Sequence, residues 1–442
     1  MAKSVVRMTD GPIASNMVRF AGPIFLGNLF QQLYNMVDSL IVGNFAGDEA
    51  LAAVSSSGNL VFLFVGMIFG LFGGAGVVIA KYFGAEDNEK VHESVHTTLA
   101  LSIICGVLIM AIGIFLSPTI LRIMGTPQIV FPKSVLYFRL YFMGGIFICM
   151  FNAASGIFQA MGDSKHPVYY LVISSVVNVI LDLILVGGFN MGVGGAAFAT
   201  VVSQLVASVL SINKLIHTTD MCQVVLKDIK IYKNLVGEIL QMGIPTGIQN
   251  SVIGLANTVV QSHINGFGEL AMAGCGSYSK IEGFAFLPIT SFSMAITTFV
   301  SQNLGAGKKD RAKKGSVFGV GSAVLLAELI GVITFIFMPV FMQFFSKNPE
   351  VIMIGVRQAR VESLFYCLLA ASHAEAGVLR GRGKATIPMV VMLMVWCVFR
   401  VIYISFAVPY FAVITAIFIA YPLTWSISTA IFTFLLARKE NV

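Results

Sequence analysis

The chain has 442 residues, of which 57% are hydrophobic and only 11% charged, and its formal net charge is +7. Soluble domains carry about 25% charged residues, so the composition excludes a soluble enzyme. It predicts a polytopic protein of the lipid bilayer, where basic residues set orientation and are no sign of nucleic-acid binding. The first twenty residues lack the apolar core and cleavage site of a removable signal peptide, so none is expected.

Twelve apolar stretches reach the roughly 20 residues that a membrane span needs, which predicts an all-α membrane protein. Pro23 and Pro245 lie inside the first and seventh stretches, where a proline favours a kink. The glycine-rich segment 70–76 suits close helix packing. The expected transmembrane helices are 15–43, 50–80, 95–118, 133–160, 166–188, 193–216, 237–264, 270–303, 316–345, 353–379, 385–408 and 412–437.

Lysine and arginine are unevenly distributed over the connections. Most of them fall in one alternating set, which includes both termini and the long connection 213–236. Because cytoplasmic connections are enriched in these residues, we expect both termini on the cytoplasmic side of the cell inner (plasma) membrane. Twelve helices with both ends on one side agree with this orientation.

The two halves of the chain match when one is shifted by 221 residues. Gly47 then meets Gly268, and Gly162 meets Gly383. Each half holds six helices, so the halves should be pseudo-symmetric lobes related by an axis along the membrane normal, with a site at or near their interface. The predicted parts are an N-terminal lobe 1–212, an inter-lobe linker 213–236 and a C-terminal lobe 237–442.

A polar face interrupts the first apolar stretch. Gln31, Tyr34, Asn35 and Asp38 are spaced at i, i+3, i+4 and i+7, which places them on one side of a helix. An ionised carboxylate in hydrocarbon costs roughly 3 kcal/mol on insertion scales, so Asp38 should face a bundle interior or an aqueous cavity. We expect Asp38 to couple to a cation or proton, and the other three residues to line the cavity.

A second intramembrane acid lies on the fifth helix. Asn178 and Asp182 share one face there, at the depth of Asp38, and Thr200 on the sixth helix reaches the same layer, while Asn152 lies deeper. Their repeat counterparts are mostly apolar or aromatic, so the polar set belongs to the N-terminal half. Such oxygens suit hard cations, and paired carboxylates can share a proton. The alternative is a hydrogen-bonded polar cluster that serves packing alone.

Several charges also lie inside the C-terminal apolar stretches. Structural ion pairing or cavity lining is the expectation for them, and Arg400 could pair with Glu328 or Glu375. The set comprises Lys280, Glu282, Glu328, His373, Glu375 and Arg400.

The segment His92-Glu93-Ser94-Val95-His96 matches the H-E-x-x-H pattern of zinc metalloproteases. It follows a polar run at a membrane edge, and no third ligand is apparent from spacing. We therefore expect an amphipathic helix start at the interface. A zinc site at His92 and His96, and with it an intramembrane metalloprotease, is the remote alternative.

These features resemble the multidrug and toxic compound extrusion (MATE) family over nearly the whole chain. The resemblance implies two six-helix lobes in a V-shaped fold, with no enzyme activity and no cofactor. It implies export of amphipathic, often cationic drugs in exchange for Na⁺ or H⁺. The motifs that carry it are Gln31-x-x-Tyr34-x-x-x-Asp38 continuing to Val42-Gly43, Gly162-Asp163, Asn178-x-x-x-Asp182, Gly305-Ala306 and Leu379-Arg380-Gly381.

The resemblance also assigns a cation site. Family members with such a site in the N-terminal lobe use residues that map onto Asp38, Asn152, Asn178, Asp182 and Thr200. Other members place carboxylates in the seventh and tenth helices. Here the seventh has none between its proline and its histidine, and the tenth has only His373 and Glu375 near the expected place. The pattern is therefore more similar to the DinF-like than to the NorM-like branch, and no cation site is expected in the C-terminal lobe.

The sequence thus predicts a monomeric secondary antiporter for small amphipathic molecules. The first helix should change between straight and bent forms around Pro23 as the acids bind and release the coupling ion. A flippase for lipid-linked saccharides on a related fold is the nearest rival. A flippase would need a strongly cationic cavity, and few lysines or arginines lie within these helices.

Overall fold

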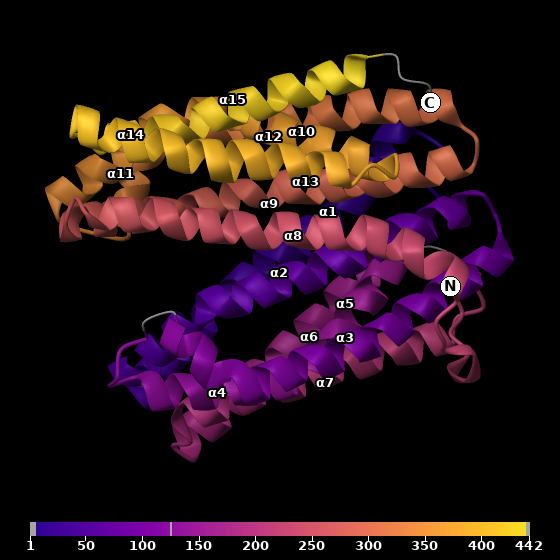
Figure 1. The fold of residues 1–442 in the computed structure, drawn as a ribbon, viewed down its shortest axis with the longest axis horizontal. Coiled ribbons are helices and arrows are strands. Elements are labelled where there is room, and N and C mark those ends of the chain that lie inside the picture. The colour runs from indigo at the N-terminus through magenta and orange to yellow at the C-terminus, as the bar shows by residue number, and fades with distance from the viewer. Residues whose placement is uncertain (1–5, 124–125, 439–442) are drawn as a thin grey trace. The chain divides into compact units, whose positions relative to one another are not determined.

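The computed structural model describes residues 6–123 and 126–438, without the side chains of residues 48, 51, 52 and 55–60, and all regular structure in these ranges is helical (Figure 1). The elements are α1 (Ile13–Ile41), η1 (Val42–Ala46), α2 (Asp48–Gly84), α3 (Asn88–Ile123), α4 (Phe131–Met143), α5 (Gly145–Ala160), α6 (Lys165–Asp182), η2 (Leu183–Gly188), α7 (Gly192–Ile216), η3 (Leu226–Asp228), α8 (Lys233–Asn265), α9 (Glu269–Gly305), α10 (Lys309–Gln343), α11 (Pro349–Glu362), η4 (Ser363–Phe365), α12 (Tyr366–Gly381), α13 (Thr386–Met392), η5 (Leu393–Phe399), α14 (Arg400–Phe411) and α15 (Thr415–Ala437).

Each of the twelve expected membrane helices coincides with one helix or with a run of helices interrupted inside the span. The fourth consists of α4 and α5, which meet at a bend of 49°. The tenth consists of α11 and α12 with the short η4 between them, and the eleventh of α13, η5 and α14. Within the described residues, eight helices are individually long and apolar enough to cross a bilayer, and nine if α4 and α5 form one span.

The backbone repeats at the 221-residue offset. Gly47 and Gly268 precede α2 and α9 with φ of 84° and 93°, and Gly162 and Gly383 have φ of 88° and 79°. Residues with side chains rarely adopt this region, so glycine is required at the same turns of both halves. The break between α4 and α5 at Gly144 likewise recurs at the end of η4 in the second half. The predicted internal repeat is present in the conformation as well as in the sequence.

The described chain divides into two compact units. The first contains the residues up to Arg7 and Leu26–Gly247, and the second contains Met8–Phe25 and the chain from Ile248 onward. These boundaries differ from the predicted 1–212, 213–236 and 237–442, because α1 divides shortly after Pro23 and α8 shortly after Pro245, and the linker falls in the first unit. A proline removes a backbone hydrogen bond, so the two halves of such a helix can pack with different neighbours.

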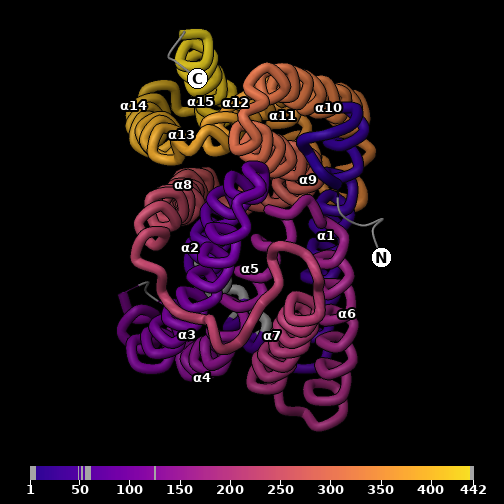
Figure 2. The backbone as a smooth tube through the Cα atoms, turned by 90° about the vertical axis from the view of Figure 1, so that its right-hand side faces the viewer, coloured from indigo at the N-terminus to yellow at the C-terminus, as the bar shows by residue number. Residues whose placement is uncertain are grey.

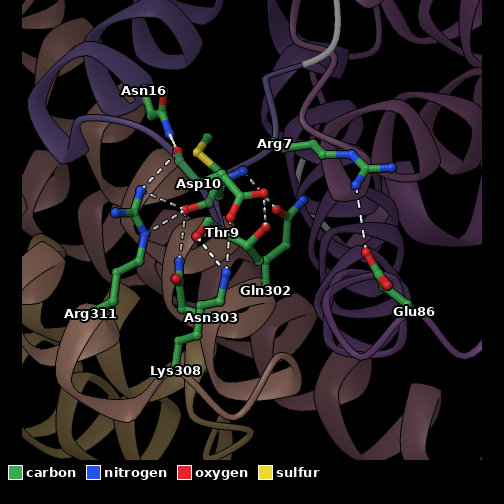
Figure 3. Close-up of polar contacts among 10 residues, drawn as sticks. Arg7, Thr9, Asp10, Asn16, Glu86, Gln302, Asn303, Lys308 and Arg311 are labelled. Atoms are coloured by element: carbon green, nitrogen blue, oxygen red, sulfur yellow. Dashed lines mark hydrogen bonds and ion pairs between the residues drawn. The ribbon is translucent and has the colours of Figure 1, made fainter.

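The start of the chain is anchored within the second unit (Figure 3). The Met8 backbone N–H donates to Gln302 Oε1 at 3.1 Å, and its carbonyl accepts from Asn303 Nδ2 at 3.0 Å. Lys308 Nζ donates to Asp10 Oδ1 at 2.9 Å. These bonds hold the residues before α1 on the turn between α9 and α10, so the first half of α1 begins as part of the second unit.

The first half of α8 is held in the first unit by glycine contacts with α2. A Cβ on Gly70 would lie 2.3 Å from the Gly247 backbone, and one on Gly74 would lie 2.5 Å from that of Gly243. No side chain fits at such distances, so the two helices touch backbone to backbone. The close packing predicted for the glycine-rich segment is confirmed at these positions. Figure 2 shows α6 and α7 side by side elsewhere in the same unit.

Candidate functional site: a paired-acid centre in the first unit

The helices α1 and α6, which carry the two predicted acids, each continue into a π-helical turn at their C-terminal end. η1 follows Asp38 within one turn of α1, and η2 begins directly after Asp182. The two turns contact each other, with the Phe45 ring packed against Gly187. Such turns are rare and frequently mark functional sites, because they change the direction in which the neighbouring side chains project. Their contact sets the two acids at one depth.

The structure brings Asp38 and Asp182 together, and the two carboxyl groups interact directly. Asp182 is fully buried and Asp38 is half-buried. No N–H or hydroxyl group of the described residues donates to Asp38 Oδ1 or to either carboxylate oxygen of Asp182. Burying a carboxylate without a hydrogen-bond donor costs free energy unless the charge is compensated.

The two residues predicted beside Asp182 complete one side of the centre. Asn178 is fully buried, and its Nδ2 donates to Thr200 Oγ1 at 3.5 Å. Asn178 Oδ1 is buried and accepts no hydrogen bond from a described residue. Thr200 Oγ1 in turn donates to the Ala196 carbonyl at 3.0 Å. The amide is thus turned so that its oxygen is available alongside the carboxylates.

Two tyrosines flank the pair, and sequence reasoning identified only one of them. Tyr34, predicted on the polar face of α1, interacts electrostatically with both acids, and so does Tyr137 on α4. Tyr137 is buried and its ring stacks on that of Tyr141 at 6.0 Å between centroids. The repeat held a signal for it, because Tyr137 corresponds to the polar Gln358, and a polar residue in both copies of a membrane helix is unusual.

The remaining predicted residues make only local hydrogen bonds in the described structure. Asn152 Nδ2 donates to the Ile148 carbonyl of its own helix at 2.8 Å. Gln31 Nε2 donates to Asn35 Oδ1 at 3.3 Å, one turn along α1. Asn35 is exposed. The cavity-lining role of Gln31, Tyr34 and Asn35 and a role for Asn152 at the acids stay predictions.

The charge of the centre is not balanced by the protein. No lysine, arginine or histidine of the described residues forms an ion pair with either acid. The available oxygens are carboxylate, amide and hydroxyl, which are ligands for hard cations such as Na⁺. The same pair can instead share a proton, because close carboxylates resist carrying two negative charges.

The histidines of the H-E-x-x-H segment are used in another way. His96 Nε2 accepts from the Val225 N–H at 2.9 Å, and His96 Nδ1 lies 2.7 Å from the His92 carbonyl. His92 Nε2 lies 3.3 Å from Asp228 Oδ2. No group of three or more potential ligands able to hold a metal occurs among the described residues. These histidines fix the 213–236 connection to the start of α3.

The ion pairs considered for Arg400 are wrong. Glu328 accepts from the Cys367 N–H at 3.1 Å, and Glu375 accepts from the Thr433 hydroxyl at 2.7 Å. Arg400 instead interacts electrostatically with Glu282 and with Glu362, and sequence reasoning had assigned Glu362 no role. The sequence does not reveal which face of a helix turns toward a neighbour, and the break at η4 adds to this uncertainty.

The MatE family model matches this chain twice, over residues 23–184 and 245–406. The chain belongs to the MatE family. The two matches begin at Pro23 and Pro245, which confirms the repeat independently.

Curated relatives support the same conclusion for this MatE protein. It is 27% identical over 423 residues to "Probable multidrug resistance protein YoeA" of Bacillus subtilis, covering 93% of this chain and 91% of that one. The MatE relatives are transporters, so this chain is a multi-pass membrane transporter and not an enzyme.

Solved structures confirm the fold. "Crystal structure of MATE in the bent conformation" matches with a TM-score of 0.90 at 22% identity, over 99% of this chain and 98% of that one. "Crystal structure of MATE in the straight conformation" matches with a TM-score of 0.91 at 22% identity, over 98% and 97%. The predicted all-α fold of twelve helices in two repeated halves is therefore confirmed.

Proposed function

We propose that this MatE transporter is a secondary antiporter that exports amphipathic, cationic small molecules in exchange for Na⁺ or H⁺. The observation that supports it is the Asp38–Asp182 pair, buried in one unit without a basic partner among the described residues. A buried charge without a partner is costly, so a mobile cation or proton would stabilise the pair strongly.

In an antiporter, binding of the ion has to be coupled to a conformational change, and α1 is the helix that would couple them. Asp38 lies in the part of α1 that belongs to the first unit, whereas Pro23 lies in the part that belongs to the second. Binding at Asp38 would favour one form of the helix around Pro23 by its differential affinity for the two forms. A solved relative is named for bent and straight conformations, which agrees with such a change.

The substrate would contact the polar face of α1 beside the acids. Gln31, Tyr34 and Asn35 offer amide and aromatic groups on that face. An organic cation and the coupling ion would then compete for the same negative charge, which is the basis of exchange. The DinF-like branch, the cytoplasmic termini and the monomeric state belong to this proposal.

The test is transport in proteoliposomes with Na⁺ and H⁺ gradients imposed separately. Efflux of a fluorescent cation should follow one of the two gradients, and Asp38→Asn and Asp182→Asn should abolish the stimulation. Ser39→Ala is the matched control, because this exposed hydroxyl lies next to Asp38 and donates to the Asn35 carbonyl of its own helix. Gradient-driven efflux at the normal rate in correctly inserted Asp182→Asn protein would refute the proposal.

A further inference from the structure

A second pair of acids lies in the other unit, together with an arginine: Glu362 and Arg400 are buried, and Glu282 is half-buried. Tyr278 and Glu282 come from α9, Glu362 ends α11, and Arg400 begins α14. All four belong to the second unit, so the cluster is separate from the Asp38–Asp182 centre. The expectation that this half holds no cation site was based on the seventh helix and on the tenth, where only His373 and Glu375 lie near the expected place. Glu362 lies earlier in the tenth helix, at the end of α11.

Glu362 is the most enclosed of these groups, with none of its surface exposed. Its Oε1 accepts from Gln358 Nε2 at 3.0 Å, and the Tyr278 hydroxyl also interacts with the carboxyl group. Glu362 Oε2 is buried and accepts no hydrogen bond from a described residue. Glu282 interacts electrostatically with Glu362 and with Arg400. Glu362 thus has a buried oxygen left open, on a carboxyl group that interacts electrostatically with a second acid and with an arginine.

Arg400 provides a fixed positive charge for both acids. It is 2% exposed, and its guanidinium donates to Thr424 Oγ1 at 2.8 Å. It lies over the rings of Tyr421 and Trp396, at 4.5 Å and 5.2 Å from their centroids. Arg400 Nε is buried and donates to no described acceptor. Stacking and hydrogen bonding thus hold the guanidinium in one position, so it cannot move toward one acid and away from the other.

The cluster has one more negative than positive charge when both glutamates are ionised. Two ionised glutamates and one arginine leave a net charge of −1 among buried apolar side chains, including Cys275, Met338 and Met342. An uncompensated charge in such surroundings costs several kcal/mol, whereas a single proton on either carboxyl group removes it. A metal cation would have to approach a guanidinium that already interacts with both acids, and it would need further oxygen ligands. A proton has neither requirement.

We propose that Glu282 and Glu362 share one proton beside Arg400, so that the second unit has a proton site of its own. The proton is delivered by a hydronium ion from the water: one O–H bond of the hydronium breaks, one O–H bond forms on either carboxylate, and a neutral water molecule is released. The open Oε2 of Glu362 is the position at which the proton would sit or donate. This site is distinct from the coupling centre at Asp38 and Asp182 and does not depend on which ion is used there.

Infrared spectroscopy tests the proposal directly, because a protonated carboxylic acid has a C=O stretch that a carboxylate lacks. The sample is full-length protein carrying Asp38→Asn and Asp182→Asn, so that the first pair cannot contribute. Glutamate labelled with ¹³C in the side-chain carboxyl should shift the band, which identifies a glutamic acid. Glu362→Gln and Glu282→Gln should each remove this band, because the remaining acid is then balanced by Arg400.

Two further variants make the result specific. Glu375→Gln is the matched control, since this buried glutamate already accepts from Thr433 and should leave the cluster's band in place. Arg400→Met removes the fixed cation, so neutrality needs two protons and the band should double. If Glu362→Gln does not fold, Tyr278→Phe should still move the band frequency by removing a hydroxyl that contacts Glu362.

Three outcomes would overturn the proposal. One is the absence of a glutamic acid band at neutral pH. Another is a band that persists unchanged in both Glu362→Gln and Glu282→Gln. The third is loss of the band when Na⁺ is added at constant pH, because the site would then take a metal cation. Since the first acid pair is absent from every sample, failure here does not bear on the antiport proposal.

Discussion

Each unit holds a pair of acids with one member fully buried, but the charged neighbours of the two pairs differ. In the first unit Asp38 and Asp182 have amide and hydroxyl neighbours and no basic partner among the described residues. In the second unit Glu282 and Glu362 face Arg400. The repeat shows where the difference arises, because Arg400 corresponds to Val179, next to Asn178. At this position of the repeat, the second unit thus has a fixed positive charge that the first unit lacks.

The acids themselves are not repeat partners. Asp38 and Asp182 correspond to Val259 and Tyr403, and Glu362 corresponds to Tyr141. What the units share is a polar layer on the fourth and tenth helices, before the break in each. The same backbone therefore supports an ionisable cluster in both halves, while the identity and charge of the groups have diverged.

The largest expected effect comes from removing the fixed cation. Arg400→Met should destabilise the protein by about 3–5 kcal/mol, the order of the cost of leaving a buried charge without the opposite charge that compensates it. Thermal unfolding in detergent measures it. Adding Glu362→Gln to Arg400→Met should restore part of the loss by removing one of the stranded acids. If the double variant is less stable than Arg400→Met, the guanidinium does not neutralise this pair.

The comparison can be reversed in the other unit. Val179 and Asp182 lie at i and i+3 on α6, so Val179→Arg would place a guanidinium near the first acid pair. Ion-stimulated efflux should fall at least about tenfold, which corresponds to 1.4 kcal/mol, because the fixed charge replaces the mobile one. Val179→Met is the control for side-chain size and should retain transport. Equal activity of both variants would show that the arginine does not reach the acids.

The sequence predicted the parts of this picture that depend on hydrophobic length and helical period. Twelve helices, the 221-residue offset and the meeting of Asp38 with Asp182 all follow from apolar runs and from the depth of polar residues along them. The Glu362–Arg400 interaction does not follow, because it depends on how neighbouring helices are rotated about their axes.

The boundary between the units could not be predicted from sequence patterns either. Pro23 and Pro245 marked the two helices that divide, but their presence predicts a bend and not a change of neighbours. The neighbours are set by particular contacts: Gly243 against Gly74 for α8, and Met8 against Gln302 and Asn303 for the start of α1. None of these contacts leaves a periodic signal in the sequence.

Each unit includes the first half of a helix that divides at a proline: α8 in the first unit and α1 in the second. The contacts that hold these two halves differ, and breaking them should have a smaller effect on stability. Gly74 permits backbone contact with α8, whereas its repeat counterpart is Ala295. Gly74→Leu should destabilise the first unit by about 1–3 kcal/mol, the usual cost of overpacking. Gly73→Leu is a matched control one residue away, because a Cβ there meets nothing within 4 Å. Similar losses in thermal stability for both variants would contradict the backbone contact.

In the second unit, polar bonds hold the start of α1, and removing one of them should have the smallest effect on stability. Lys308 donates to Asp10 and holds the pKa of that carboxyl below its usual range. The two side chains are largely exposed, so the pair should contribute at most about 0.5 kcal/mol. A carboxyl with a lowered pKa stabilises the fold above its unfolded pKa of about 3.9, and the contribution disappears as the pH falls through the lower folded value.

Asp10→Asn should therefore be slightly less stable than the unchanged protein at pH 7, and the two should converge on acidification below about pH 4. Thermal unfolding over this pH range is the measurement. Because both charges are exposed to water, salt should also reduce the difference. A difference that grows on acidification would mean that Asp10 acts through something other than Lys308. Its small size is itself informative: the bonds of the Met8 backbone, which no salt or mild acid removes, would then provide most of the hold on the start of α1.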